Sequence, residues 1–207
     1  MKTILFQGDS ITDCGRSRED DIYLGEGYPH LVSAELGFEY PTEYKFLNRG
    51  VSGNRIVDVY ARIKADIINL KPDVMSILIG VNDVWHEVGW QNGVDADKYF
   101  RIYCMLIEEV KAALPDLKIM IMEPYVMKGT ATEEKWDIFR SEVDKRAAKA
   151  KEVAEKYNLT FIPLQDKLNA ALDRAPGEHW TRDGVHPTKY GHELIKREWL
   201  KAFNTLK

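Results

Sequence analysis

The chain has 207 residues, of which 44% are hydrophobic and 30% charged, and its formal net charge is −4 at pH 7. This composition is that of an ordinary folded protein and excludes a disordered chain. The 29 Lys and Arg residues do not outnumber the 33 Asp and Glu residues, so nothing indicates nucleic acid or an anionic membrane as a partner. The length favours one domain, which we expect to span residues 1–207.

The predicted strands are short segments rich in Ile, Val, Leu, Met and Phe, with Gly, Pro or Asn near their ends. In chain order they are Thr3–Gln7, Lys45–Asn48, Val74–Ile79, Leu117–Met122 and Thr160–Pro163. None of them alternates strictly between apolar and polar residues. This pattern is typical of parallel strands that are covered on both faces.

Between the strands, apolar residues recur with helical spacing. The predicted helices run over about Pro29–Leu36, Ile56–Leu70, Tyr99–Leu114, Thr132–Tyr157 and Pro187–Phe203. Alternating strands and helices predict a parallel sheet with helices on both faces. The expected fold class is therefore α/β, a three-layer α/β/α sandwich with a five-stranded parallel sheet of flavodoxin-like type.

The cysteines and the first residues bear on the cellular compartment. Cys14 and Cys104 form neither a CxxC motif nor a metal-type pair, so no disulfide framework is predicted. The N-terminal sequence MKTILFQGDS lacks the apolar stretch of about 7–15 residues that a secretory signal needs. The longest apolar run, Ile102–Ile107, is far shorter than the roughly 20 residues that span a bilayer. We expect a cytoplasmic protein without a membrane partner.

Polar and glycine-rich segments follow the predicted strands, where ligands bind in a parallel α/β sheet. They are Gly8–Asp13 (GDSITD), Asn48–Asn54 (NRGVSGN), Gly80–Trp85 (GVNDVW) and, after the last strand and a short helix, Trp180–Pro187 (WTRDGVHP). Acyl transfer needs a hydroxyl, a histidine that accepts its proton and a carboxylate that orients the histidine. It also needs donors for the oxyanion, such as backbone N–H groups and an Asn side chain. The four segments contain this set of groups.

In this order the four segments resemble the blocks of the SGNH, or GDSL-type, hydrolases, and the resemblance covers nearly the whole chain. It implies that Ser10 is the nucleophile, His186 the general base and then acid, and Asp183 the residue that orients His186. It also implies an oxyanion hole made of the backbone amides of Ser10 and Gly53 and the side-chain amide of Asn82. No metal and no cofactor are implied.

Neighbouring glycines and aspartates receive other roles. Gly50 is close enough to compete with Gly53 as an oxyanion donor, but the spacing Asn-x-x-x-Ser-Gly fits the family better with Gly53. Gly50 is then expected to support the loop's conformation. Asp9, Asp13 and Asp83 are expected to be structural, since carboxylates beside turns commonly accept backbone N–H bonds.

The segments around Ser10 and Asn82 look like those of the bacterial acetylxylan esterases. This similarity implies an enzyme that removes acetyl groups from xylan or xylo-oligosaccharides, its small-molecule partner, often as a homo-oligomer. Aromatic rings stack on sugar faces and polar side chains bond hydroxyl groups. The candidate substrate-binding residues are accordingly Trp85, Asn54, Arg55 and Trp180, with Arg16 and Trp90 as further ones.

Several alternatives remain open from the residues. A short-chain acyl esterase, a thioesterase or a lysophospholipase fits the same residues and is separated by its preference for acyl chain length. A sugar-binding module that has lost catalysis is the non-enzymatic alternative, although a binder needs no Ser, His and Asp together. Flavin binding, which the fold permits, is disfavoured because Asp9 and Asp13 would repel the phosphate.

His179, His186 and His192 follow no HExxH pattern, so no metal is expected. Cys14 is expected to be a small buried hydrophobe rather than a site-adjacent thiol.

Overall fold

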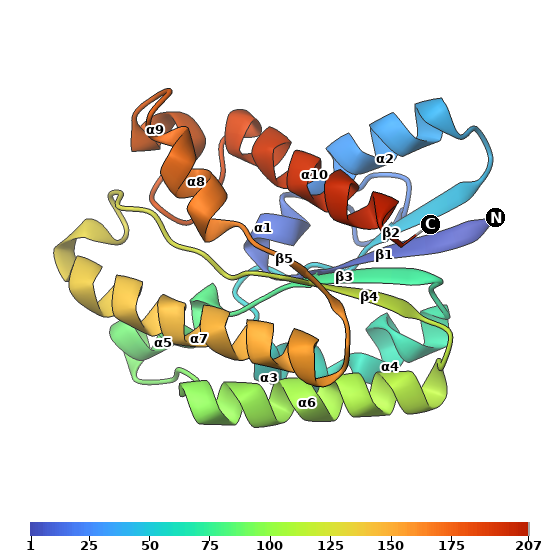
Figure 1. The fold of residues 1–207 in the computed structure, drawn as a ribbon, viewed down its shortest axis with the longest axis horizontal. Coiled ribbons are helices and arrows are strands. Elements are labelled where there is room, and N and C mark those ends of the chain that lie inside the picture. The colour runs from blue at the N-terminus through green and yellow to red at the C-terminus, as the bar shows by residue number, and fades with distance from the viewer. Residues whose placement is uncertain (207) are drawn as a thin grey trace.

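The computed structural model describes residues 1–206, which contain a five-stranded sheet with all of its strands parallel (Figure 1). The strands are β1 (Lys2–Gly8), β2 (Tyr44–Asn48), β3 (Val74–Leu78), β4 (Lys118–Met122) and β5 (Thr160–Ile162). Their order across the sheet is β2-β1-β3-β4-β5. Each predicted strand is confirmed to within one residue at either end.

Helices cover both faces of the sheet (Figure 1). In the view of Figure 1, α2 (Tyr28–Glu39), α8 (Gln165–Ala171), α9 (Gly177–Trp180) and α10 (Lys189–Asn204) lie above the sheet. Below it lie α3 (Ile56–Ala61), α4 (Ile63–Asp66), α5 (Val81–Trp90), α6 (Ala96–Ala113) and α7 (Trp136–Lys156). The helices predicted at 29–36, 99–114, 132–157 and 187–203 are confirmed as α2, α6, α7 and α10, and so is the three-layer α/β/α fold.

Two apolar cores account for the strand sequences. Successive side chains of a strand point to opposite faces, so Ile4 and Phe6 of β1 enter one core while Leu5 enters the other. On the side of α2 and α10, the fully buried Trp199 packs with its ring centroid 5.4 Å from that of Phe6. Because both faces are buried, the strands need no alternation of polar residues.

One predicted helix is wrong, and one helix of the structure is not predicted. The single helix expected over 56–70 is divided into α3, α4 and a 3-10 helix, Ile68–Leu70. Its apolar residues keep their contact with the sheet, but the backbone leaves helical geometry at Arg62, whose guanidinium bonds Asn54, Asp66 and Gln7. No helix is predicted over Val81–Trp90, where α5 forms, because its first turn contains the polar residues Asn82 and Asp83.

No helix within residues 1–206 is both long enough and apolar enough to cross a membrane.

Candidate active site

Ser10 stands just after the carboxyl end of β1, which lies between β2 and β3, and it begins the short helix α1 (Ser10–Asp13). Asp9 caps this helix, since its Oδ1 accepts the Ile11 N–H at 2.9 Å. The turn requires glycine at position 8, because a Cβ there would lie 2.4 Å from the Leu78 carbonyl oxygen. Ser10 therefore sits on a tight strand-to-helix turn at the edge where ligands bind in parallel sheets.

His186 and Asp183 belong to the turn that precedes α10. An isolated bridge joins Thr181 to Pro187, and the Arg182 N–H donates to the His186 carbonyl oxygen at 2.7 Å. Asp183 Oδ1 accepts the backbone N–H groups of Val185 at 2.9 Å and His186 at 2.8 Å. These bonds hold the carboxylate in place beside the imidazole three residues later.

The three side chains form one continuous chain of hydrogen bonds. Asp183 Oδ2 lies 2.7 Å from His186 Nδ1, and His186 Nε2 lies 2.9 Å from Ser10 Oγ. With the Nδ1 proton directed at the carboxylate, the Nε2 lone pair faces the serine hydroxyl. This is the arrangement in which a histidine takes the proton of an attacking serine.

The charges in this chain favour a basic imidazole. Burial opposes ionisation of Asp183, but hydrogen bonds from the His186 side chain and from backbone N–H groups outweigh it and lower the pKa of Asp183 to about 2. The hydrogen bond to Asp183 raises the pKa of His186 above its ordinary value, against the effect of burial. Asp183 is thus ionised at neutral pH and stabilises a protonated His186.

Each of the three groups predicted for the oxyanion hole keeps a hydrogen-bond donor without a partner in residues 1–206. The N–H of Ser10 lies at the start of a helix, where no intrahelical acceptor exists, and the Gly53 N–H has no partner among residues 1–206. Gly53 adopts φ +81°, a conformation that favours glycine. Asn82 Nδ2 donates one hydrogen to the Asn54 carbonyl oxygen at 3.1 Å, which leaves its second hydrogen available.

Gly50, the competing donor, has its amide already engaged. The Gly50 N–H donates to Asn48 Oδ1 at 2.9 Å. A Cβ at this position would lie 2.3 Å from the Asp13 amide nitrogen, so the close approach of the two segments requires glycine. The structure thus favours Gly53 over Gly50 for the oxyanion and gives Gly50 a role in the loop's conformation.

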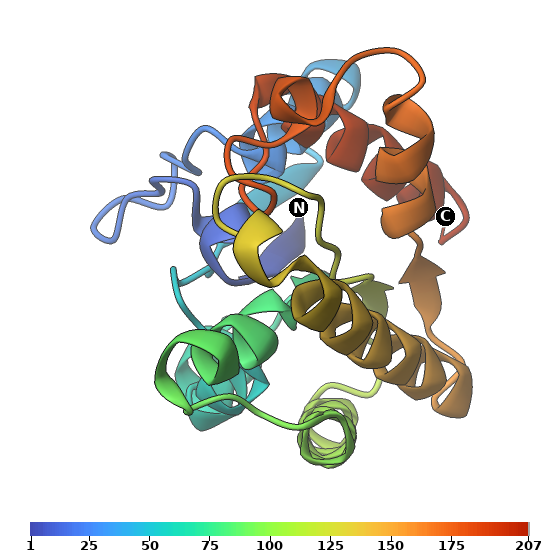
Figure 2. The same cartoon turned by 90° about the vertical axis from the view of Figure 1, so that its left-hand side faces the viewer.

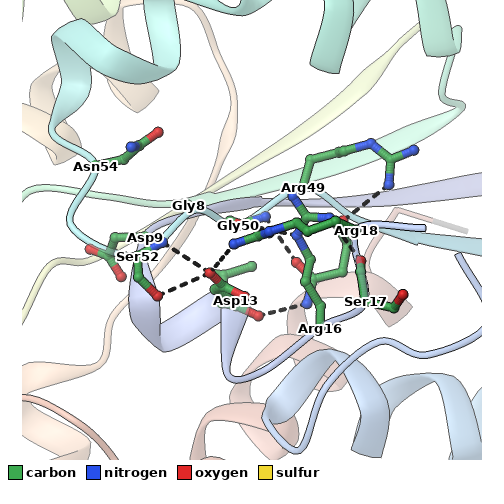
Figure 3. Close-up of polar contacts among 12 residues, drawn as sticks. Gly8, Asp9, Asp13, Arg16, Ser17, Arg18, Arg49, Gly50, Ser52 and Asn54 are labelled. Carbon is green, nitrogen blue, oxygen red and sulfur yellow. Dashed lines mark hydrogen bonds and ion pairs between the residues drawn. The ribbon is translucent and has the colours of Figure 1, made fainter. Parts of the chain in front are cut away.

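Asp13 fastens the Gly53 loop to the helix of Ser10 (Figure 3). Its Oδ2 accepts the N–H and the hydroxyl of Ser52 at 3.0 and 2.9 Å and pairs with Arg18 at 2.6 Å. The Gly50 carbonyl oxygen accepts from both Arg16, at 2.8 Å, and Arg18, at 3.0 Å. The residue before Gly53 is therefore held at a fixed distance from the α1 backbone, in keeping with a structural role for Asp13.

The predicted substrate-binding residues do not share one location. The Trp85 ring lies 5.9 Å from the His186 ring and packs edge-on against Phe139 on its other side. Trp180 is only 6% exposed and donates its indole N–H to the Ala175 carbonyl oxygen, which speaks against a sugar lying on it. Trp90 is exposed at the end of α5, with its ring against His86.

The polar candidates are held by other parts of the protein. Arg55 pairs with Asp58 at 2.9 Å and donates to the Asn92 carbonyl oxygen at 2.6 Å. Asn54 Oδ1 accepts from Arg62 at 2.8 Å, and Arg16 binds Gly50 as described. Among the six candidates, Trp85 is the one whose ring contacts His186.

The structure also shows site residues that sequence reasoning missed or misplaced. Arg182, Glu26 and His192 line a pocket together with Ser10 and His186. Cys14 lines it too and is half-buried, so the expectation of a buried hydrophobe is wrong. The segment from 14 to 27 projects from the molecule (Figure 2) and has no periodicity from which its position could be predicted.

The side chains of Asp9 and Asp83 lie beneath this site and are completely enclosed. Asp83 accepts the Ile56 N–H at 3.1 and 3.2 Å, and Asp9 accepts the Ile11 N–H. Both therefore bond backbone amides, as the sequence predicts. Asp9 Oδ2 has no hydrogen-bond partner within residues 1–206. Burial raises the pKa of Asp9 to about 7, against the effects of the Ile11 N–H and His186.

We expect Asp9→Asn to make folding stability less sensitive to pH. An acid whose folded pKa lies near 7 and whose unfolded pKa lies near 3.8 destabilises the fold as pH rises through that window. Asparagine keeps the cap acceptor and carries no charge. Urea denaturation between about pH 4 and pH 8 should show a stability gain of the variant over wild type that increases by about 1.4 kcal/mol per pH unit at most. A gain independent of pH would contradict the assignment.

Comparison with known proteins agrees with this geometry. The model of the GDSL-like lipase/acylhydrolase family matches residues 6–194. An acetylxylan esterase of Geobacillus stearothermophilus is 34% identical over 96% of this chain and 92% of its own. A protein of Parabacteroides merdae described as a GDSL-like lipase is 35% identical, with a TM-score of 0.92 over 97% of this chain and 94% of its own.

A crystal structure of the acetylxylan esterase of Geobacillus stearothermophilus superposes with a TM-score of 0.86 at 33% identity, covering 97% of this chain and 93% of its own. The fold, the site and these similarities define a carboxylic ester hydrolase. The chain belongs to the GDSL-like lipase/acylhydrolase family.

Proposed function

We propose that the protein is a serine esterase that removes acetyl groups from carbohydrate, xylan or xylo-oligosaccharide, through an acyl-enzyme on Ser10. The observation that carries the acyl-enzyme is the hydrogen-bonded chain from Ser10 through His186 to Asp183. The substrate class rests on the similarity to the Geobacillus acetylxylan esterase. A cytoplasmic location and assembly into homo-oligomers belong to the same proposal.

The reaction follows from the positions of the groups. Ser10 Oγ attacks the acetyl carbonyl carbon while His186 Nε2 accepts the hydroxyl proton. The negative charge on the former carbonyl oxygen is stabilised by the Ser10 and Gly53 amides and the Asn82 side chain. When the C–O bond to the sugar breaks, His186 returns the proton to the leaving oxygen. Water, deprotonated by His186, then releases acetate from Ser10.

Hydrolysis of aryl esters from acetate to decanoate tests this proposal. Fast turnover of the acetate that collapses beyond butyrate, followed by release of acetate from acetylated xylo-oligosaccharides, is the expected result. A preference for long chains would instead indicate a thioesterase or lysophospholipase. Binding of xylo-oligosaccharides without hydrolysis of any ester would indicate a sugar-binding module.

We expect Asn82→Ala to lower kcat by about 10²–10³, with a smaller change in KM. The Asn82 amide would act on the charge that develops in the transition state, so its loss would affect turnover more than binding. The kinetics of aryl acetate hydrolysis measure this effect. Because Asn82 also bonds the Asn54 carbonyl oxygen, the melting temperature should be recorded in parallel. An unchanged kcat would remove Asn82 from the oxyanion hole.

A further inference from the structure

A pocket of about 400 Å³ opens directly beside the reacting groups. Its volume falls within the range of small-molecule sites. Ser10 and His186 form one wall, and the other lining residues are Cys14, Gly15, Glu26, Arg182, Pro187 and His192. Because His186 Nε2 would protonate the leaving oxygen, a pocket bordered by both Ser10 and His186 is where the alcohol part of an ester can lie.

Arg182 brings an unpaired cation into this pocket. Its backbone is fixed, since its N–H donates to the His186 carbonyl oxygen at 2.7 Å beside the Thr181–Pro187 bridge. The side chain is exposed, and its guanidinium has no hydrogen-bond or ion-pair partner among residues 1–206. The donors of Arg182 are therefore free to bind a ligand.

Glu26 brings an unpaired carboxylate from a different segment. Its N–H donates to the Cys14 carbonyl oxygen at 2.8 Å. The flanking residues Gly25 and Gly27 allow this segment to approach Cys14 closely. A Cβ on Gly25 would lie 2.5 Å from the Cys14 carbonyl oxygen, and one on Gly27 would lie 2.9 Å from the Cys14 Cβ. The Glu26 carboxylate, like the Arg182 guanidinium, has no partner within the described part of the chain.

The Glu26 carboxylate and the Arg182 guanidinium together indicate which kind of ligand the pocket can bind. Sugar hydroxyl groups donate to a carboxylate and accept from a guanidinium, so both charges can be satisfied at once. A fatty alcohol would leave both charges unbonded while displacing their water. A phosphate or carboxylate would be repelled by Glu26, and an ammonium group by Arg182.

We propose that Arg182 and Glu26 form a subsite that binds the hydroxyl groups of the sugar from which Ser10 removes the acetyl group. This inference rests on the proposed function and adds to it the residues that recognise the leaving alcohol. It assigns substrate recognition to two residues whose sequence context gave no indication of such a role.

The test compares two substrates on the same variants. One is an acetylated xylo-oligosaccharide, and the other is 4-nitrophenyl acetate, whose leaving group has no hydroxyl to engage either residue. For Arg182→Met and Glu26→Gln, the kcat/KM ratio of the sugar ester to the aryl ester should fall about 10-fold or more relative to wild type. The loss should appear mainly as an increase in KM for the sugar ester, and Arg182→Lys should restore part of it.

Arg101→Met and Glu39→Gln are the matched controls, because both side chains are exposed and lie outside the pocket. Their substrate ratios should equal that of wild type. A parallel fall on both substrates would show that Arg182 and Glu26 act on the reacting groups rather than on the sugar, and would overturn the subsite. An unchanged ratio would overturn it as well. Wild type that hydrolyses the aryl ester but not the sugar ester would contradict the proposed substrate itself, a result distinct from the other two.

Discussion

Ser10→Ala is expected to lower kcat for aryl acetates by about 10⁶, to the level left by binding and the oxyanion donors alone. The methyl group of alanine cannot form the ester bond to acetate, and the Asp183–His186 pair then has no hydroxyl to activate. No other side-chain hydroxyl is hydrogen-bonded to His186 within residues 1–206. Stopped assays with purified wild type and variant measure the effect.

Ser33→Ala supplies the matched control. Ser33 bonds only the His30 carbonyl oxygen within its own helix, so its replacement should leave kcat within a factor of about two. A serine-reactive phosphonate should label wild type once and leave Ser10→Ala unlabelled, as seen by intact-protein mass spectrometry. Residual activity of Ser10→Ala above about one hundredth of wild type would contradict a nucleophilic role, since triad removals leave far less.

The layers of the fold could be predicted because strands that are buried on both faces have a recognisable apolar sequence. Strands such as β3, in which all five residues are buried, are short and mostly apolar, and the apolar residues of the helices between them recur with a different period. The interruption of the helix predicted over 56–70 is not indicated by any such sequence pattern. The apolar residues of this region keep helical spacing, and the interruption depends on the contacts of Arg62 with Asn54 and Gln7, which lie outside it.

The triad, whose side chains the structure joins by hydrogen bonds, could be predicted because its segments are assigned to the edge of the sheet shared by the carboxyl ends of parallel strands. The substrate-binding candidates are indicated only by residue type and by their nearness in sequence to the site segments. Side-chain type does not say whether Trp180 is buried or whether Arg55 is already paired with Asp58. In the described part of the chain, Arg182 and Glu26 have no such side-chain partners, and that difference is visible only in three dimensions.

Asp183→Asn is expected to lower kcat by about 10⁴, the effect of the same change in other serine hydrolases with this triad. The structure gives the reason. Asp183 Oδ1 accepts two backbone N–H groups, from Val185 and His186. An amide oxygen would remain there, which turns the amide NH₂ toward His186 Nδ1. That nitrogen must then accept, so the imidazole proton moves to Nε2 and the ring can no longer take the proton of Ser10.

The pH profile separates this explanation from a loss of structure. Asp183 raises the pKa of His186 above its usual value, so the wild-type kcat/KM should increase with pH through a midpoint above the ordinary imidazole pKa of 6.5. Without the carboxylate charge the pKa of His186 falls, and the acid limb of the residual activity should move to lower pH. Asp173→Asn, on an exposed turn, should leave both the rate and the limb unchanged. A general loss of folded protein would lower the rate equally at every pH and leave the acid limb in place. Reduced kcat with an unmoved acid limb would therefore show that Asp183 does not act on the ionisation of His186.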